Sequence, residues 1–326
     1  MPLDPQAAAL LEAMAKMNAG RPLMHEGTPD EARRAYAASV PPTPDDPLAS
    51  VEERTIPGPA GPLRLRVYRP LGEGALPAIV YFHGGGWVMG SIESHNALCH
   101  GLASRSGCVV AAVDYRLAPE DPFPAGLDDC VAAVAWVVAN AGELGVDPER
   151  VAVGGDSSGG NLAAAACLVA RDRGGPPIAF QLLIYPVLAF GYDTPSYAEN
   201  AEGYFLTAVA MRWFSDQYLS RPEHAADPYA APLLAADLAG LPPAHMVTAE
   251  YDPLRDEDEA YVAAMADAGV ATSLHRYDGM IHGFVRMAAS LDQGRAALDE
   301  CAAVLRQALR PAELSSATAT DAAGAG

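Results

Sequence analysis

The segment Gly155–Gly160 contains a serine, Ser157, with a glycine two residues before it and another two residues after it. An apolar run, Val151–Val153, precedes this segment, and small residues follow it from position 161 to 170. The pattern predicts a strand, a sharp turn and a helix, because only residues without bulk let strand and helix approach so closely. A serine at the tip of such a turn can act as a nucleophile if a histidine takes its proton and a carboxylate orients that histidine.

Two later segments offer this acid and this base. Asp252 comes just after the apolar run Ala244–Ala249, and His282 comes shortly after the predicted strand Thr272–Tyr277 with a glycine beside it. Each residue follows a strand, and the order serine, aspartate, histidine is the order found in α/β-hydrolases. We therefore predict that Ser157, Asp252 and His282 form a catalytic triad.

Each partner has a plainer alternative. Asp252 could be a charge that stabilises a helix N-terminus, a role that Asp256 or Asp258 could fill equally well. His282 could be a loop histidine with satisfied hydrogen bonds. Two other histidines, His95 and His100, are five residues apart and do not share a helix face, so they do not predict a zinc site.

A glycine-rich loop, Gly84–Gly86, directly follows the apolar run Ala78–Phe82. Acyl transfer builds negative charge on a carbonyl oxygen, and backbone N–H groups of glycines can approach that oxygen closely. We predict an oxyanion hole formed by the amides of Gly85, Gly86 and Ser158, with Gly84 as an alternative to either glycine. His83 is expected to hold this loop by hydrogen bonds rather than to act as a base.

The chain resembles the hormone-sensitive-lipase family of α/β-hydrolases, which comprises the bacterial family IV carboxylesterases. The resemblance covers roughly residues 51 to 310 and rests on five segments in the family order: His83–Gly86, Asp114–Glu120, Gly155–Asn161, Asp252–Asp256 and His282–Phe284. It implies serine esterase activity on acyl monoesters, an N-terminal helical cap and no cofactor. Ser158 stands where alanine is also common among relatives, but it contributes only a backbone N–H.

From these motifs we expect a serine carboxylesterase for short to medium acyl chains, because a capped site suits small monomeric esters. An acyltransferase or amidase with the same triad remains an alternative, as does a non-catalytic small-molecule receptor on the same scaffold. The aromatic residues that could line a pocket are not assigned individually: Trp87, Tyr192, Tyr204, Phe205, Trp213 and Phe214. Asp114 and Arg116 are expected to fix a loop near the site.

The composition of the chain argues against several classes of binding partner. The 326 residues carry a formal net charge of -20, which disfavours nucleic acid because binding to phosphates needs clustered basic residues. The five cysteines contain no Cys-x-x-Cys pair, so neither a disulfide framework nor a thiolate metal site is predicted. No apolar run approaches the roughly 18 residues that cross a bilayer. The N-terminus lacks a basic leader, so we expect a cytoplasmic protein without membrane contact; a homodimer stays open.

The order of elements predicts the architecture. Apolar strands alternate with helical segments from about residue 78 onward, which is typical of an α/β fold with a mostly parallel sheet and helices on both faces. The predicted helices span residues 125–141, 158–171, 208–219, 254–268 and 289–309. We divide the chain into an N-terminal helical cap segment (1–48), a hydrolase core (49–189 and 241–312), a cap insertion (190–240) and a disordered tail (313–326).

Overall fold

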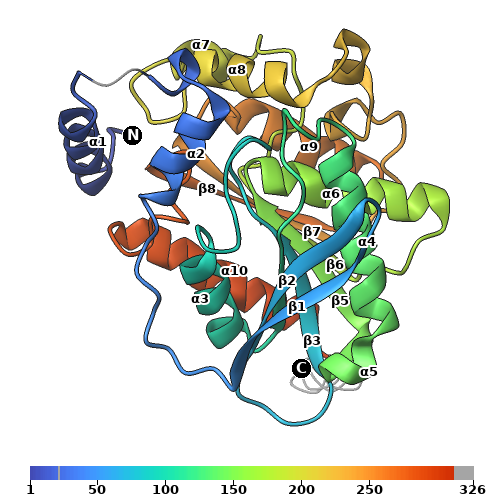
Figure 1. Ribbon diagram of the computed structural model, residues 1–326. Coiled ribbons are helices and arrows are strands. Elements are labelled where there is room, and N and C mark those ends of the chain that lie inside the picture. Colours follow the sequence, from blue (N-terminus) through green and yellow to red (C-terminus); the bar gives the residue numbers. More distant parts are fainter. Residues whose placement is uncertain (21–22, 312–326) are drawn as a thin grey trace, which may run out of the picture.

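The computed structural model describes residues 1–20 and 23–311 (Figure 1). The tail predicted for residues 313–326 lies outside these. The strands are β1 (Ser50–Gly58), β2 (Gly61–Arg69), β3 (Leu76–Phe82), β4 (Val109–Val113), β5 (Val146–Asp156), β6 (Phe180–Ile184), β7 (Ala244–Tyr251) and β8 (Thr272–Ile281). The helices are α1 (Pro5–Met17), α2 (Pro29–Ala37), α3 (Asn96–Ser106), α4 (Ala125–Ala139), α5 (Ala141–Leu144), α6 (Ser158–Arg173), α7 (Pro195–Glu199), α8 (Ala208–Tyr218), α9 (Arg255–Asp267) and α10 (Asp292–Ala308). Three short 3₁₀ turns are η1 (Met24–Glu26), η2 (Pro222–Ala226) and η3 (Pro232–Leu234).

The described strands form one sheet in the order β1-β2-β4-β3-β5-β6-β7-β8. The pairs β1–β2 and β2–β4 are antiparallel, and every pair from β4 through β3 to β8 is parallel. Parallel neighbours need long crossover connections, which the intervening helices provide. The predicted α/β class with a mostly parallel sheet is therefore confirmed.

Helices cover both faces of the sheet, and β3 shows how. Its residues Ala78, Val80 and Phe82 belong to a core with α4, α6 and α9, whereas Ile79 and Tyr81 belong to a core with α3 and α10. All five residues are fully buried. Because successive side chains of a strand point to opposite faces, an uninterrupted apolar run is the pattern that a doubly covered central strand requires.

Several predicted elements differ from the observed ones; β8, for example, extends to Ile281, four residues past its predicted end at Tyr277. β5 begins at Val146, five residues before the predicted strand, because Val146 pairs with Leu76 and the register then shifts. Its polar residues 147–150 show no strand pattern. The helix predicted over residues 125–141 ends at Ala139, and Asn140 separates it from α5. The region 190–240 contains the predicted helix and, in addition, α7 and two 3₁₀ turns. These additional elements are too short to show a helical repeat of apolar residues in the sequence.

The N-terminal helix α2 and the helices α7 and α8 lie at the same end of the molecule (Figure 1). Arg33 of α2 fixes it there, since its guanidinium donates to the carbonyl oxygens of Val88 and Ala118 at 2.8 and 2.9 Å and pairs with Glu120. In α7, the Ser196 hydroxyl donates to the carbonyl of Pro253 at 2.6 Å. Segments far apart in the chain therefore cover this end of the sheet.

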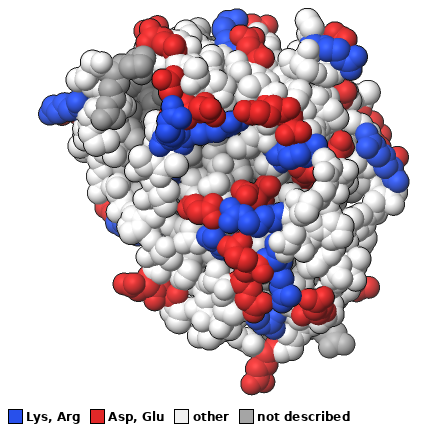
Figure 2. All heavy atoms as spheres, in the orientation of Figure 1, with Lys and Arg blue, Asp and Glu red and all other residues white. Residues whose placement is uncertain are grey.

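Charged side chains of both signs alternate over the face formed by β1 and β2 (Figure 2). Arg64 and Arg66 of β2 both pair with Glu93, and Arg66 also pairs with Glu53 of β1. This face needs no helical cover because its outward side chains are polar. None of the helices in residues 1–20 and 23–311 is long and apolar enough to cross a membrane.

Candidate active site

Ser157 lies at the junction of β5 and α6 with φ 55° and ψ −124°, a conformation that L residues other than glycine rarely adopt. Its neighbours explain how this turn is possible. A Cβ on Gly159 would lie 2.0 Å from the carbonyl oxygen of Phe82, and one on Gly155 would lie 2.4 Å from the backbone of Gly159. The Ser157 amide donates to the Ile184 carbonyl at 2.9 Å, which pins the turn to β6.

The three residues of the predicted triad lie in one hydrogen-bonded chain. His282, just after β8, places Nε2 at 2.9 Å from the Ser157 Oγ, and its Nδ1 lies 2.6 Å from Oδ2 of Asp252, just after β7. Because a carboxylate can only accept, Nδ1 donates to Asp252 and Nε2 is left to accept the serine proton. The geometry can therefore move a proton from Ser157 to His282.

Burial and a second hydrogen bond hold the acid in place. Asp252 is fully buried, and its Oδ1 accepts the amide N–H of Leu254 at 3.0 Å. The Asn200 side chain donates to the Asp252 carbonyl at 3.2 Å. The ring of Tyr185 packs 4.7 Å from that of His282. Water is thus kept from the aspartate–histidine contact, where it would weaken the interaction.

Neither alternative acid is hydrogen-bonded to His282. Asp256 pairs with Arg255 and accepts the amide N–H of Ser196 at 2.8 Å. Asp258 is fully buried, and neither of its oxygens has a hydrogen-bond partner in the described part of the chain. Among the described residues, Asp252 is the only carboxylate hydrogen-bonded to His282.

The glycine loop presents two amides without an acceptor. Gly85 and Gly86 have φ of 131° and 61°, and neither of their N–H groups has an acceptor among the described residues. Ser158 is the first residue of α6, where backbone N–H groups have no partner within the helix. The amide of Gly84, in contrast, donates to Oδ1 of Asp156 at 3.1 Å. This bond removes Gly84 from the available donors and leaves the other three.

The loops beside the site are held by the residues expected to do so. Tyr115 donates its hydroxyl to the His83 carbonyl at 2.6 Å and stacks on the His83 ring at 4.3 Å. Burial lowers the pKa of His83 to about 4, so the ring is neutral at pH 7. Arg64 donates to Asp114 at 3.1 Å, and Arg116 to the buried Asp129 at 2.8 Å.

Two phenylalanines of the region 190–240 reach the site. A Cβ on Gly86 would lie 2.2 Å from Cδ1 of Phe214, and one on Gly283 would lie 3.2 Å from Cε1 of Phe205. Phe214 therefore lies against the glycine loop and Phe205 against the turn that carries His282. Among the other candidate aromatics, Trp87 is buried and stacks on Tyr218 at 4.1 Å, so it is part of the core.

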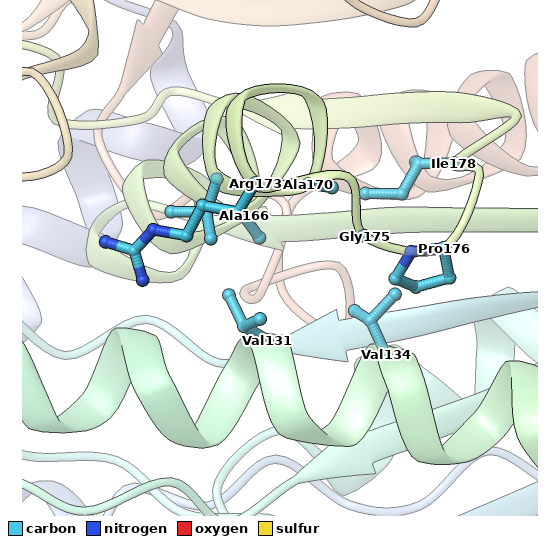
Figure 3. A pocket seen from close by; sticks show the side chains of 9 residues that line it. Val131, Val134, Ala166, Ala170, Arg173, Gly175, Pro176 and Ile178 are labelled. Carbon is cyan, nitrogen blue, oxygen red and sulfur yellow. The ribbon is translucent and has the colours of Figure 1, made fainter.

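One hollow elsewhere in the molecule carries no chemistry. It lies between α4 and the connection from α6 to β6, has a volume of about 110 Å³ and is shown in Figure 3. Its lining includes Val131 and Val134 of α4 and Pro176 and Ile178 of the connection, with Arg173 at its edge. Ligand pockets usually hold ~300 Å³ or more. This hollow is too small and too apolar to compete with the serine site.

The sequence interpretation misses two residues near Ser157, namely Asp156 and His95. Asp156 stands beside the nucleophile, but the motif alone gave it no role. His95 was considered only as a zinc ligand, and its Nε2 lies 3.2 Å from Oδ2 of Asp156. The two residues are 61 positions apart, and no local pattern connects them.

Comparison with known proteins agrees with the fold and identifies related esterases. A family model described as alpha/beta hydrolase fold matches residues 79–286. The chain is 45% identical to carboxylic ester hydrolase LipN of Mycobacterium tuberculosis over 243 residues, covering 73% of this chain and 65% of LipN. It is 38% identical to ethyl acetate hydrolase of Pseudomonas putida over 322 residues, covering 95% of this chain and 100% of that protein.

A solved structure shows the same arrangement over nearly the whole chain. The hyperthermophilic esterase of the archaeon Pyrobaculum calidifontis superposes with a TM-score of 0.89 at 45% identity, covering 94% of this chain and 99% of that one. The family model spans more than half of the chain, and the related proteins carry esterase names. The chain therefore belongs to the α/β-hydrolases, in the hormone-sensitive-lipase-like branch of bacterial family IV carboxylesterases.

Proposed function

We propose that this protein is a serine carboxylesterase that hydrolyses monoesters of short to medium acyl chains, with Ser157 as nucleophile, His282 as base and Asp252 as the orienting acid. The observation that carries this proposal is the continuous chain of hydrogen bonds at 2.9 and 2.6 Å that joins the three side chains. A serine hydroxyl is a weak nucleophile without such a base.

In the first half of the reaction, Ser157 Oγ attacks the ester carbonyl and its proton passes to Nε2 of His282. Asp252 stabilises the resulting imidazolium and keeps its ring in the productive orientation. The tetrahedral intermediate collapses when His282 donates this proton to the leaving alkoxide, which departs as the alcohol. An acyl ester of Ser157 remains.

The second half repeats these steps with water. His282 takes a proton from a water molecule as its oxygen attacks the acyl-enzyme, and then returns the proton to Ser157 as the acid leaves. In both halves the carbonyl oxygen becomes an oxyanion. The unpaired amides of Gly85, Gly86 and Ser158 support our assignment of the oxyanion hole, because each preorganised donor is worth about 10²–10³ in kcat.

The preference for short acyl chains is supported by the two phenylalanines. Phe214 is buried against the glycine loop, and Phe205 lies beside the turn of His282, so large rings stand on two sides of the reacting groups. A relative of this chain bears the name ethyl acetate hydrolase, which denotes a small acyl group. We therefore expect acetate and butyrate esters to be better substrates than long-chain esters.

Turnover of p-nitrophenyl butyrate by purified variants tests this function. We expect Ser157→Ala to lower kcat by about 10⁴-fold or more, and Asp252→Asn by about 10³–10⁴-fold because the histidine loses its orienting acceptor. Asp256→Asn is the matched control and should keep most of the activity. Full turnover by Ser157→Ala would overturn the assignment. Loss of turnover in Asp256→Asn but not in Asp252→Asn would identify Asp256 as the orienting acid.

Product analysis separates hydrolysis from the related reactions. The wild-type enzyme should release butyric acid even when an alcohol or amine is added at high concentration. Formation of a new ester or amide as the main product would identify an acyltransferase. Binding of small esters without any turnover would identify a receptor.

A further inference from the structure

Asp156 immediately precedes Ser157 in the chain, and its side chain is almost completely buried. It accepts three hydrogen bonds. Tyr81 donates its hydroxyl to Oδ1 at 2.9 Å, the Gly84 amide donates to the same oxygen at 3.1 Å, and Oδ2 lies 3.2 Å from Nε2 of His95. None of these bonds takes part in the reaction steps derived above. Burying a carboxylate costs free energy unless hydrogen bonds and charges compensate it.

The bond to Gly84 extends the pairing of β3 with β5 beyond the last strand pair, Phe82 with Gly155. Asp156 is the last residue of β5 and precedes Ser157, whereas Gly84 begins the loop whose next two amides are the assigned oxyanion donors. The fit is tight on both sides, since a Cβ on Gly84 would lie 2.5 Å from Oδ2 of Asp156. Past the ends of the paired strands, this side chain is a direct hydrogen-bonded link between the nucleophile turn and the donor loop.

The surroundings keep Asp156 ionised and immobile. Burial would raise the pKa of its carboxyl, but His95, Tyr81 and Arg286 outweigh burial and hold the pKa at about 2. His95 is itself anchored, because its Nδ1 lies 2.9 Å from the hydroxyl of Ser94. An ionised carboxylate accepts stronger hydrogen bonds than a neutral one, so the bond from Gly84 is strengthened.

Arg286 connects this cluster to the cap and to the base. It follows His282 by four residues, and its guanidinium lies 4.6 Å over the ring of Tyr36 in α2. Nη1 of Arg286 is buried and has no hydrogen-bond partner among the described residues. The ring of Tyr36 also stacks on His95 with 6.4 Å between centroids. The cap helix thus covers the cluster from the outside and shields it from water.

We propose that Asp156 is a positioning residue that sets the distance between Ser157 and the oxyanion donors by holding the Gly84 amide, with His95 as its anchor. This role rests on the proposed esterase function. A displacement of donors or nucleophile by about 1 Å can cost about 10²-fold in rate, while substrate binding, which uses other contacts, is little affected. The signature of Asp156 should therefore be a change in kcat with KM nearly unchanged.

The test measures kcat per active site, counted by the burst of p-nitrophenol from a p-nitrophenyl phosphonate. We expect Asp156→Ala to lower kcat on p-nitrophenyl butyrate by about 10²-fold with KM within about threefold of wild type. Asp156→Asn keeps an oxygen for the Gly84 amide and should restore activity to within about tenfold of wild type. A trifluoromethyl ketone, whose adduct with Ser157 carries an oxyanion, should lose affinity for Asp156→Ala by the same factor as kcat/KM.

Asp129→Ala is the matched control, because Asp129 is an equally buried aspartate that holds a loop through Arg116. It should lower the melting temperature without changing kcat per titrated site.

If Asp156→Ala does not fold, His95→Phe replaces it and should lower kcat about tenfold. The proposal is overturned if the variant that folds keeps kcat within about threefold of wild type, or if Asp156→Asn is as slow as Asp156→Ala. Activity of the wild type in the same assay separates this outcome from failure of the esterase assignment.

Discussion

At the scale of single residues, the carboxyls of Glu257 and Asp258, five and six residues after Asp252, stand out by their burial. Oε1 of Glu257 accepts the amide N–H groups of Leu188 and Ala189 at 2.7 and 3.3 Å, and Asp258 has no hydrogen-bond partner in the described chain. Burial raises the pKa of Glu257 to about 8 and that of Asp258 well above its usual value. The Glu257 side chain is therefore mostly protonated at neutral pH.

This burial makes stability depend on pH in a definite direction. The folded-state pKa of Glu257 lies above its unfolded value, so the stabilisation is complete below pH ~4.5 and is lost as the pH rises through about 8. We expect the free energy of unfolding to fall between pH 5 and pH 9, with about 4 kcal/mol of that fall due to Glu257. Glu257→Gln, which keeps the acceptor oxygen but cannot ionise, should flatten the profile.

Urea unfolding at a series of pH values measures this effect. Glu259→Gln is the control, because Glu259 lies on the same helix but is partly exposed and paired with Arg276. It should leave the slope above pH 6 unchanged. If the profile of Glu257→Gln runs parallel to that of wild type, the burial of Glu257 is not the cause.

At the scale of elements, α8 carries the side chain of Phe214, which lies against the glycine loop Gly84–Gly86. Its N-terminus is capped by Thr207, whose hydroxyl accepts the Ala210 amide at 3.1 Å. The buried face includes Met211, Phe214 and Tyr218, spaced at three and four residues as one side of a helix requires. A rigid, capped helix can hold the Phe214 ring at a fixed depth above Gly86.

Shortening that side chain should therefore change substrate choice. We expect Phe214→Ala to raise the ratio of kcat/KM for p-nitrophenyl octanoate over butyrate by about tenfold, because the space left by the ring can take additional methylenes. The loss of core contacts should also lower stability by about 3 kcal/mol. Val209→Ala, on the exposed side of the same helix, should leave the chain-length profile unchanged. An unaltered profile in Phe214→Ala would show that the ring does not limit the acyl site.

The sequence predicted those elements whose burial produces a recognisable run or period of apolar residues. β3, β7 and the helix after Ser157 follow from apolar or small-residue runs, but residues 147–150 of β5 are polar and become strand only by pairing with β3. The same limit applies to the site. Ser157, Asp252 and His282 each follow a strand, so local pattern was enough to name them. Asp156 with His95, and Phe214 with Gly86, meet only through the folded chain, and no sequence period marks such contacts.

At the scale of the whole molecule, the formal charge of -20 is the dominant electrostatic feature. The ion pairs over β1 and β2 are mostly exposed, and exposed pairs contribute little to stability. Repulsion among the excess carboxylates, by contrast, acts over the whole surface and is weakened by salt. Net repulsion should therefore outweigh the screening of individual pairs.

We expect the melting temperature to rise by about 2–5 °C when sodium chloride is raised from about 0.02 M to about 0.5 M at pH 8. Circular dichroism at a helix band measures the transition. Choline chloride at equal ionic strength should give the same shift if screening is the cause. A fall in melting temperature with either salt would mean that pairs such as Arg66 with Glu53 carry more stability than their exposure indicates.

The crowding at the turn of Ser157 also bears on how such proteins evolve. Gly155 and Gly159 are demanded by backbone atoms of β3 and α6, whatever the serine does. On the proposed mechanism, a descendant that lost His282 would stop hydrolysing esters, yet it would still need both glycines to fold. The two glycines are therefore expected in every protein with this scaffold. A histidine at position 282 is expected only in those that hydrolyse esters by the proposed mechanism. A screen of family members for activity should therefore be sorted by the residue at position 282.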